Sequence, residues 1–127
     1  MPAKVLIVDD SSTTLLMEEM LLRKYTNFDI VQARNGQEAV QIALSEQPDL
    51  ILMDVIMPKM DGFAACREMR RQDKLRETPI ILVTSRGEPQ NVEMGFESGC
   101  NDYLTKPIES NDLLRMVNGY LTAEKAS

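Results

Sequence analysis

Short apolar runs recur along the chain and predict the strands of a buried sheet. Three of them are continuous and rich in β-branched residues, as in strands covered on both faces: residues 5–8 (VLIV), 50–53 (LILM) and 80–83 (IILV). Residues 28–33 (FDIVQA) alternate between apolar and polar positions, which indicates a less covered strand. Residues 103–105 (YLT) complete the set as a short edge strand.

Amphipathic stretches between these runs predict five helices. The first follows a Ser/Thr cluster at 11–14, the second begins with a capping-box pattern from Asn35 to Glu38, and Ser110 is the expected cap of the fifth. The positions that define the helices recur every three or four residues: Leu16, Met20, Leu21 and Tyr25; Val40, Ala43 and Leu44; Phe63, Cys66, Met69 and Arg70; a weaker set over 92–98; and Leu113, Leu114, Val117, Tyr120 and Leu121.

The order of these elements predicts the fold class. Alternating strands and helices indicate an α/β fold, a flavodoxin-like doubly wound five-stranded parallel sheet with helices on both faces. Right-handed crossovers favour the strand order 2-1-3-4-5. The 127 residues suit one core and are too few for a TIM barrel. We therefore expect one domain over residues 1–127, and Met1 and the polar end of the chain favour a natural single-domain protein.

Composition excludes several functions. Twenty acidic residues against fourteen basic ones give a net charge of −6, so we expect no direct nucleic-acid partner. Without histidine the chain has no Ser-His-Asp or Cys-His pair, no His-ligated zinc and no phosphorylation of its own histidine. Cys66 and Cys100 lack CxxC spacing and fit reduced thiols in a cytoplasmic protein. We expect no membrane insertion, since no run of about 18 apolar residues occurs.

Polar residues stand where four of the predicted strands end. They are Asp9 and Asp10, Asp54, Thr84 and Ser85, and Lys106 before Pro107. In such a sheet ligands bind beyond the carboxyl ends of the strands, at the switch point between strands one and three. Three carboxylates suit a hard cation such as Mg²⁺, a lysine and a hydroxyl can hold phosphoryl oxygens, and a carboxylate can be phosphorylated as a nucleophile. Together they are the parts of a phosphoryl-transfer site.

Taken one at a time, these residues have more ordinary explanations. An aspartate or threonine at a strand end commonly caps the next helix, and a lysine in a turn is commonly solvated. Tyr103 alone is most simply an edge-strand packing residue, and the nine methionines are core filler. The prediction therefore depends on the four strand ends together, because independent coincidences at all four are improbable.

Four segments, VLIVDDS, LILMDVIMPKMDG, IILVTS and DYLTKP, resemble the strand-end motifs of the response regulator receiver domain of two-component signalling. The resemblance runs from Lys4 to about Leu121. It implies that Asp54 accepts a phosphoryl group from a sensor histidine kinase or a histidine phosphotransfer protein. The signal then passes to a downstream protein through the face formed by the fourth helix, fifth strand and fifth helix. Such a domain assists its own phosphorylation and dephosphorylation but is not a conventional enzyme.

The resemblance also assigns individual roles. Mg²⁺ would be bound by Asp9, Asp10 and Asp54 and by the backbone carbonyl of Ile56. Thr84 and Lys106 would contact the phosphoryl group, and Thr84 and Tyr103 would form the switch. The Lys106–Pro107 bond would be cis.

Three positions depart from common receiver patterns. Ile56 and Arg86 flank the expected phosphoryl site, at positions where variation is associated with phosphoryl lifetime in the family. Ser85 stands where many members carry alanine, and its larger side chain would restrict access. These departures leave the predicted fold and chemistry unchanged and concern the kinetics.

Four other functions compete with this one. A flavodoxin-type FMN site could use the hydroxyls of residues 11–14, but Asp9 and Asp10 would repel the phosphate and aromatic residues are scarce. An aspartate-nucleophile phosphatase places its second aspartate two residues after the first, whereas Asp10 follows Asp9 directly. Dinucleotide or P-loop binding lacks any glycine before Gly36. A receiver fold that serves only for docking would not need the intact set of strand-end residues.

Overall fold

The computed structural model describes residues 2–85 and 89–126, and within them five strands alternate with five α-helices. Arg86, one of the residues expected to flank the phosphoryl site, lies outside the described residues. The elements follow the chain in the order β1 (Lys4–Val8), α1 (Ser12–Tyr25), β2 (Asp29–Ala33), α2 (Gly36–Glu46), β3 (Leu50–Asp54), α3 (Gly62–Arg70), a 3₁₀ helix η1 (Asp73–Leu75), β4 (Ile80–Thr84), α4 (Pro89–Ser98), β5 (Asp102–Thr105) and α5 (Ser110–Ala126).

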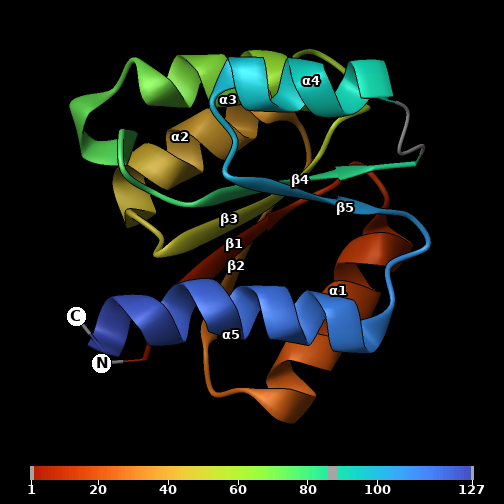
Figure 1. The fold of residues 1–127 in the computed structure, drawn as a ribbon, viewed down its shortest axis with the longest axis vertical. Coiled ribbons are helices and arrows are strands. Elements are labelled where there is room, and N and C mark those ends of the chain that lie inside the picture. Colours follow the sequence, from red (N-terminus) through yellow and green to blue (C-terminus); the bar gives the residue numbers. More distant parts are fainter. Residues whose placement is uncertain (1, 86–88, 127) are drawn as a thin grey trace.

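The sheet has the predicted architecture. All strands are parallel, in the order β2-β1-β3-β4-β5. Helices α2, α3 and α4 cover one face, and α1 and α5 cover the other (Figure 1). The predicted fold class is confirmed. The switch point falls between β1 and β3, because the chain leaves these two strands toward helices on opposite faces of the sheet.

Side chains of the central strands alternate between two buried clusters. One cluster lies toward α2 and α3 and includes Leu6, Val8, Ile51, Met53, Ile80 and Leu82. The other lies toward α1 and α5 and includes Val5, Ile7, Leu50, Leu52, Ile81 and Val83. Burial on both faces explains why these strands have continuous apolar sequences. The same alternation turns Asp9 and Asp54, which continue β1 and β3 in phase with Ile7 and Leu52, toward the α1–α5 side.

The predicted apolar face of α1 is wrong, although the helix itself is present. Three of its four expected core residues are 57% to 62% exposed, namely Leu16, Met20 and Tyr25, and only Leu21 packs partly against the core. The buried residues are instead Leu15, Glu18 and Leu22. Their spacing of three and four residues is helical, but the stripe has a glutamate at its centre. The sequence pattern therefore favoured the neighbouring, more continuously apolar stripe.

Helix ends agree with the predictions in part. Asn35 caps α2, because its Oδ1 accepts a hydrogen bond from the Glu38 N–H at 2.8 Å. Ser110 is the first residue of α5 and not its cap, since the Leu113 N–H donates to the Glu109 carbonyl at 3.0 Å. Helix α4 begins at Pro89, three residues earlier than expected, at a position where the missing N–H of proline costs no helical hydrogen bond.

Candidate functional site

Three carboxylates meet beyond the carboxyl ends of β1 and β3. Asp9 and Asp10 follow β1, and Asp54 is the last residue of β3. Each offers one oxygen atom to a group in which all three atoms lie within 4.8 Å of one another. Asp9 and Asp54 are buried, whereas Asp10 is exposed. The cluster is therefore anchored inside the protein and open to solvent on one side.

Backbone and side-chain donors orient the two buried carboxylates. Oδ1 of Asp9 accepts a hydrogen bond from the Ser11 N–H, and Oδ1 of Asp54 accepts one from the Val55 N–H, each at 2.9 Å. The other oxygen of each aspartate faces Lys106. Its Nζ donates to Asp9 Oδ2 at 3.1 Å and to Asp54 Oδ2 at 3.2 Å. Lys106 thus bridges the two aspartates, with a Lys106–Pro107 bond that is cis, as the resemblance implied.

The pKa values in the cluster follow from burial and charge. Burial raises the pKa of Asp54, the charge of Asp9 raises it further, and Lys106 opposes both effects. Burial works to lower the pKa of Lys106, but its hydrogen bond to Asp9 and the charges of Asp54 and Asp9 outweigh burial, so this pKa lies above its ordinary value. Lys106 is therefore an ammonium group at neutral pH, where it partly neutralises the aspartates.

The donor set of the cluster fits Mg²⁺. Hard carboxylate oxygens are the ligands that this cation takes, and it usually keeps several waters, for which the exposed side at Asp10 leaves room. Asp9, Asp10 and Asp54 are the side chains that would hold it. The backbone carbonyl of Ile56, expected as a further ligand, stays a prediction. The Ile56 side chain is 69% exposed, two residues beyond Asp54.

Thr84 lies next along the same edge, and Tyr103 lies in the neighbouring strand β5, where it pairs with Leu82. In the pairing of β3 with β4, Val83 is the partner of Asp54, so Thr84 stands one residue beyond it. Thr84 is buried. The half-buried ring of Tyr103 in β5 meets the ring of Phe96 in α4 edge-on, with the centroids 6.1 Å apart and an interplanar angle of 86°. The predicted switch aromatic therefore contacts the helix that would have to respond.

The loop after Asp54 is closed by a residue that the sequence analysis gave no role. Gly62 donates its N–H to the Val55 carbonyl at 2.8 Å, and Asp61 caps α3 by accepting from the Ala64 N–H at 2.8 Å. A Cβ atom on Gly62 would collide with the backbone carbonyl oxygen of Asp54. Only glycine permits this close approach, which sets the start of α3 directly against the backbone of Asp54.

Glu18 is a second residue that the sequence analysis missed. Its side chain lies on the sheet-facing side of α1 and is only 6% exposed. Within the described residues its Oε1 has no hydrogen-bond partner. Burial raises the pKa of Glu18 to about 8, Asp9 and Asp54 add to the rise, and Lys106 opposes it. The signal in the sequence was its position, three residues after Leu15 and four before Leu22.

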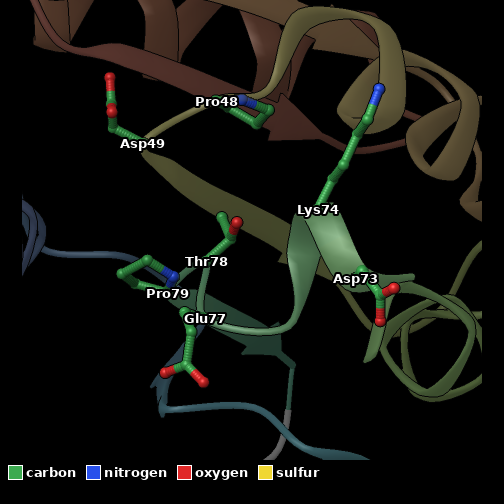
Figure 2. Close-up of a pocket in the computed structure, with 7 residues that line it drawn as sticks. All are labelled: Pro48, Asp49, Asp73, Lys74, Glu77, Thr78 and Pro79. Carbon is green, nitrogen blue, oxygen red and sulfur yellow. The ribbon is translucent and has the colours of Figure 1, made fainter. Parts of the chain in front are cut away.

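A pocket of about 360 Å³ lies away from the carboxylates. Figure 2 shows that its lining comes from the turn before β3, from η1 and from the turn before β4: Pro48, Asp49, Asp73, Lys74, Glu77, Thr78 and Pro79. These turns are at the amino ends of the strands, so the pocket and the carboxylate cluster occupy opposite edges of the sheet. In a parallel α/β sheet the carboxyl edge is the usual ligand edge, which makes the cluster the stronger candidate site.

The cysteines do not belong to the cluster. Cys66 lies in α3 and Cys100 two residues before β5, and both are free and buried. Burial raises the pKa of the Cys66 thiol and raises that of Cys100 to about 11, so both stay protonated and unreactive near neutral pH. In the described part of the chain, no helix has both the length and the apolar character that crossing a membrane requires.

Comparison with known proteins gives the family. The profile of the response regulator receiver domain matches residues 5–118. The chain belongs to the receiver domains of two-component response regulators, which are signalling switches.

The relatives include short and long regulators. Protein PilH of Pseudomonas aeruginosa is 36% identical over 119 residues, which cover 94% of this chain and 98% of PilH. Longer transcriptional regulators also match, and the chain spans about half their length. The chemotaxis protein CheY4 of Vibrio cholerae superposes with a TM-score of 0.89 at 32% identity, covering 94% of this chain and 99% of CheY4.

A third relative was solved with a metal ion. The receiver domain of the sensor histidine kinase PA1611 from Pseudomonas aeruginosa has a TM-score of 0.88 and 31% identity, with 96% of this chain and 99% of that one covered. Its structure contains magnesium coordinated in the active-site cleft.

Proposed function

We propose that this protein is a phosphorylation-controlled binding switch in which Asp54 accepts a phosphoryl group from a phosphohistidine. The donor is a sensor histidine kinase or a histidine phosphotransfer protein. The observation that carries the proposal is the Lys106 ammonium, which bridges the two buried aspartates beside the exposed Asp10. This arrangement combines a nucleophile, a cation site and a phosphoryl-binding lysine in a single cluster.

The chemistry follows from the groups that surround Asp54. A carboxylate oxygen of Asp54 forms a bond to phosphorus while the phosphorus–nitrogen bond breaks and the donor imidazole leaves. Lys106 favours the ionised nucleophile, since its charge opposes the rise in the pKa of Asp54. Mg²⁺ held by the aspartates would neutralise negative charge on the transferring group. Lys106 and the Thr84 hydroxyl then bond to phosphoryl oxygens, and hydrolysis of the acyl phosphate restores the starting state.

Exposed apolar side chains support a protein as the donor. The exposed apolar side chains on α1 include Leu16, Met17 and Met20, and the helix begins three residues after Asp9. Ile56 is also exposed, two residues after Asp54. Several large exposed apolar groups are typical of a protein contact surface. Met20→Glu should therefore slow transfer from a phosphohistidine protein while labelling by acetyl phosphate continues at the wild-type rate. An equal rate from the protein donor would contradict this docking surface.

The proposed setting is the cytoplasm, and the signal leaves through the face of α4, β5 and α5. The phosphoryl group brings about −1.5 to −2 charges and strong acceptor oxygens to Asp54. Thr84 turns toward one of these oxygens, and the ring of Tyr103 leaves Phe96 for the space beneath β4. A ligand shifts such an equilibrium only through different contacts with its two states. The Thr84 hydroxyl provides that difference here.

Phosphorylation is tested by intact mass. The wild type, incubated with acetyl phosphate and Mg²⁺, should gain the mass of one phosphoryl group, and a chelator should prevent the gain. Asp54→Asn should not be labelled, whereas Asp73→Asn, a control at an exposed aspartate on the opposite edge of the sheet, should behave as wild type. Absence of labelling in the wild type would favour the alternative, a receiver fold that serves only for docking.

Switching is tested by amide chemical shifts. Beryllofluoride, a phosphoryl mimic, should shift residues across α4, β5 and α5 in the wild type. Thr84→Ala should lose most of these shifts, while Thr78→Ala, at the amino end of the same strand, should keep them. Equal shifts in Thr84→Ala and the wild type would show that the signal travels by another route.

A further inference from the structure

Glu18 is a buried carboxyl group that the proposed chemistry does not use. It lies on the α1–α5 side of the sheet, the side toward which Asp9 and Asp54 also turn. The charges of Asp9, Lys106 and Asp54 all act on it. Its Oε1 has no partner among the described residues. Buried polar atoms in folded proteins are almost always hydrogen-bonded, so an orphaned oxygen beside an active cluster points to a partner gained in another state.

Lys106 is the cation that such a state would free. Each buried aspartate has one oxygen fixed by a backbone N–H, Asp9 by Ser11 and Asp54 by Val55. The second oxygen of each is bonded to Lys106. A metal ion bound by Asp9 and Asp54 through these second oxygens would compete with the lysine for them. The Lys106 side chain is only partly exposed, so a displaced ammonium group that stays inside the cluster needs another acceptor.

We propose that Glu18 is a positioning residue that takes over Lys106 when Asp9 and Asp54 bind Mg²⁺. The inference rests on the magnesium site of the proposed function and adds a residue to it. The ammonium group exchanges two aspartate oxygens for the carboxylate of Glu18 and so remains inside the cluster. From there it can bond to a phosphoryl oxygen on Asp54. Glu18 thereby stabilises the metal-bound state without touching the metal.

The adjacent glutamate supplies a matched control. Glu19 lies on the same helix but is already paired, with Oε2 accepting from Arg23 at 3.1 Å and Oε1 from Gln32 at 2.8 Å. Above pH 8, where Glu18 is ionised, Glu18→Gln and Glu19→Gln each remove one negative charge from α1 and keep the shape of the side chain. Only the first removes an acceptor for Lys106. A difference between them therefore separates a local effect from the general charge of the helix.

The experiment is a calorimetric Mg²⁺ titration of the folded full chain above pH 8, where Glu18 is ionised and Lys106 is still charged. Glu18→Gln should weaken Mg²⁺ binding about tenfold, as is common when an outer group that supports a metal site is removed. Glu19→Gln should agree with the wild type within about twofold. In a Lys106→Met background, which has no ammonium to relocate, Glu18→Gln should change the affinity by less than about twofold.

Three outcomes would overturn the inference. Equal Mg²⁺ affinity in the wild type and Glu18→Gln would remove the role of Glu18 and leave the magnesium site intact. If Glu18→Gln weakened Mg²⁺ binding equally in the wild-type and Lys106→Met backgrounds, Glu18 would act through the electrostatic field of its charge and not through Lys106. A wild-type chain that bound no Mg²⁺ would overturn the magnesium site itself. Urea unfolding of each variant confirms that the proteins compared are folded.

Discussion

Replacing Glu18 with glutamine should stabilise the fold increasingly as the pH rises. Burial raises the pKa of Glu18 from 4.5 to about 8, and the charges of Asp9, Lys106 and Asp54 face the same carboxyl group. The folded protein therefore keeps a proton that the unfolded chain releases. This difference stabilises the folded state fully below the pKa that Glu18 has in the unfolded chain. The stabilisation is lost as the pH rises toward the pKa of Glu18 in the folded protein. A glutamine at position 18 is neutral at every pH, so the variant has no such loss of stability over this range.

The magnitude follows from the two pKa values. Between them the folded wild type loses about 1.4 kcal/mol for each pH unit, because a pKa difference of one unit corresponds to that free energy. Integrated from about pH 5 to about pH 9, the loss attributable to Glu18 is about 4 kcal/mol. A typical domain is stable by only about 5–15 kcal/mol, so a change of this size dominates the comparison.

The assay is urea unfolding of the wild type, Glu18→Gln and Glu19→Gln at several pH values across this range. The advantage of Glu18→Gln over the wild type should grow by about 4 kcal/mol with rising pH. Glu19→Gln should follow the pH profile of the wild type, because the Glu19 side chain is partly exposed and already paired with Arg23 and Gln32. A difference between Glu18→Gln and the wild type that did not change with pH would refute the reasoning.

Three further predictions concern the same edge of the sheet. Asp10→Asn should weaken Mg²⁺ binding in a calorimetric titration, and equal affinity would contradict its assignment as a ligand. Ile56→Asn should speed dephosphorylation, because we expect the exposed Ile56 side chain to offer attacking water no hydrogen-bond partner. An unchanged or slower rate of dephosphorylation would argue against this protection of the acyl phosphate by Ile56. Gly62→Ala should cost about 1–3 kcal/mol in urea unfolding, since its Cβ meets the Asp54 carbonyl. Gly119→Ala, with no atom within 4 Å, should instead gain about 1 kcal/mol, and equal effects at both glycines would refute the steric argument.

Sheet order and the gathering of the carboxylates followed from the sequence for a physical reason. Strands buried on both faces have continuous apolar sequences, and parallel strands bring their carboxyl ends to one edge. Asp9, Asp54 and Lys106 therefore had to converge once the topology was predicted. The hydrogen-bond distances within the cluster could not be predicted from the sequence, because they depend on how the loop after β5 returns Lys106 toward β1.

The face of α1 shows where the pattern failed, and the contact made by Tyr103 shows what the pattern does not contain. A periodicity argument assumes that buried positions are apolar, and Glu18 breaks that rule while Met20 is exposed. A buried carboxyl group is stable there only in the company of Lys106 and a raised pKa, which depend on tertiary contacts. The edge-on contact of Tyr103 with Phe96 is likewise a contact between separate elements that spacing along the chain does not contain.

The central claim is that Asp54 alone carries the phosphoryl group, and chemical mapping tests it most directly. Protein phosphorylated in the presence of Mg²⁺ is reduced with borohydride, which converts an aspartyl phosphate to homoserine, and its peptides are sequenced by mass spectrometry. We predict homoserine at position 54 and unmodified aspartate at positions 9 and 10. Homoserine at position 9 or 10, or none at position 54 in a chain that had gained a phosphoryl group, would contradict the account.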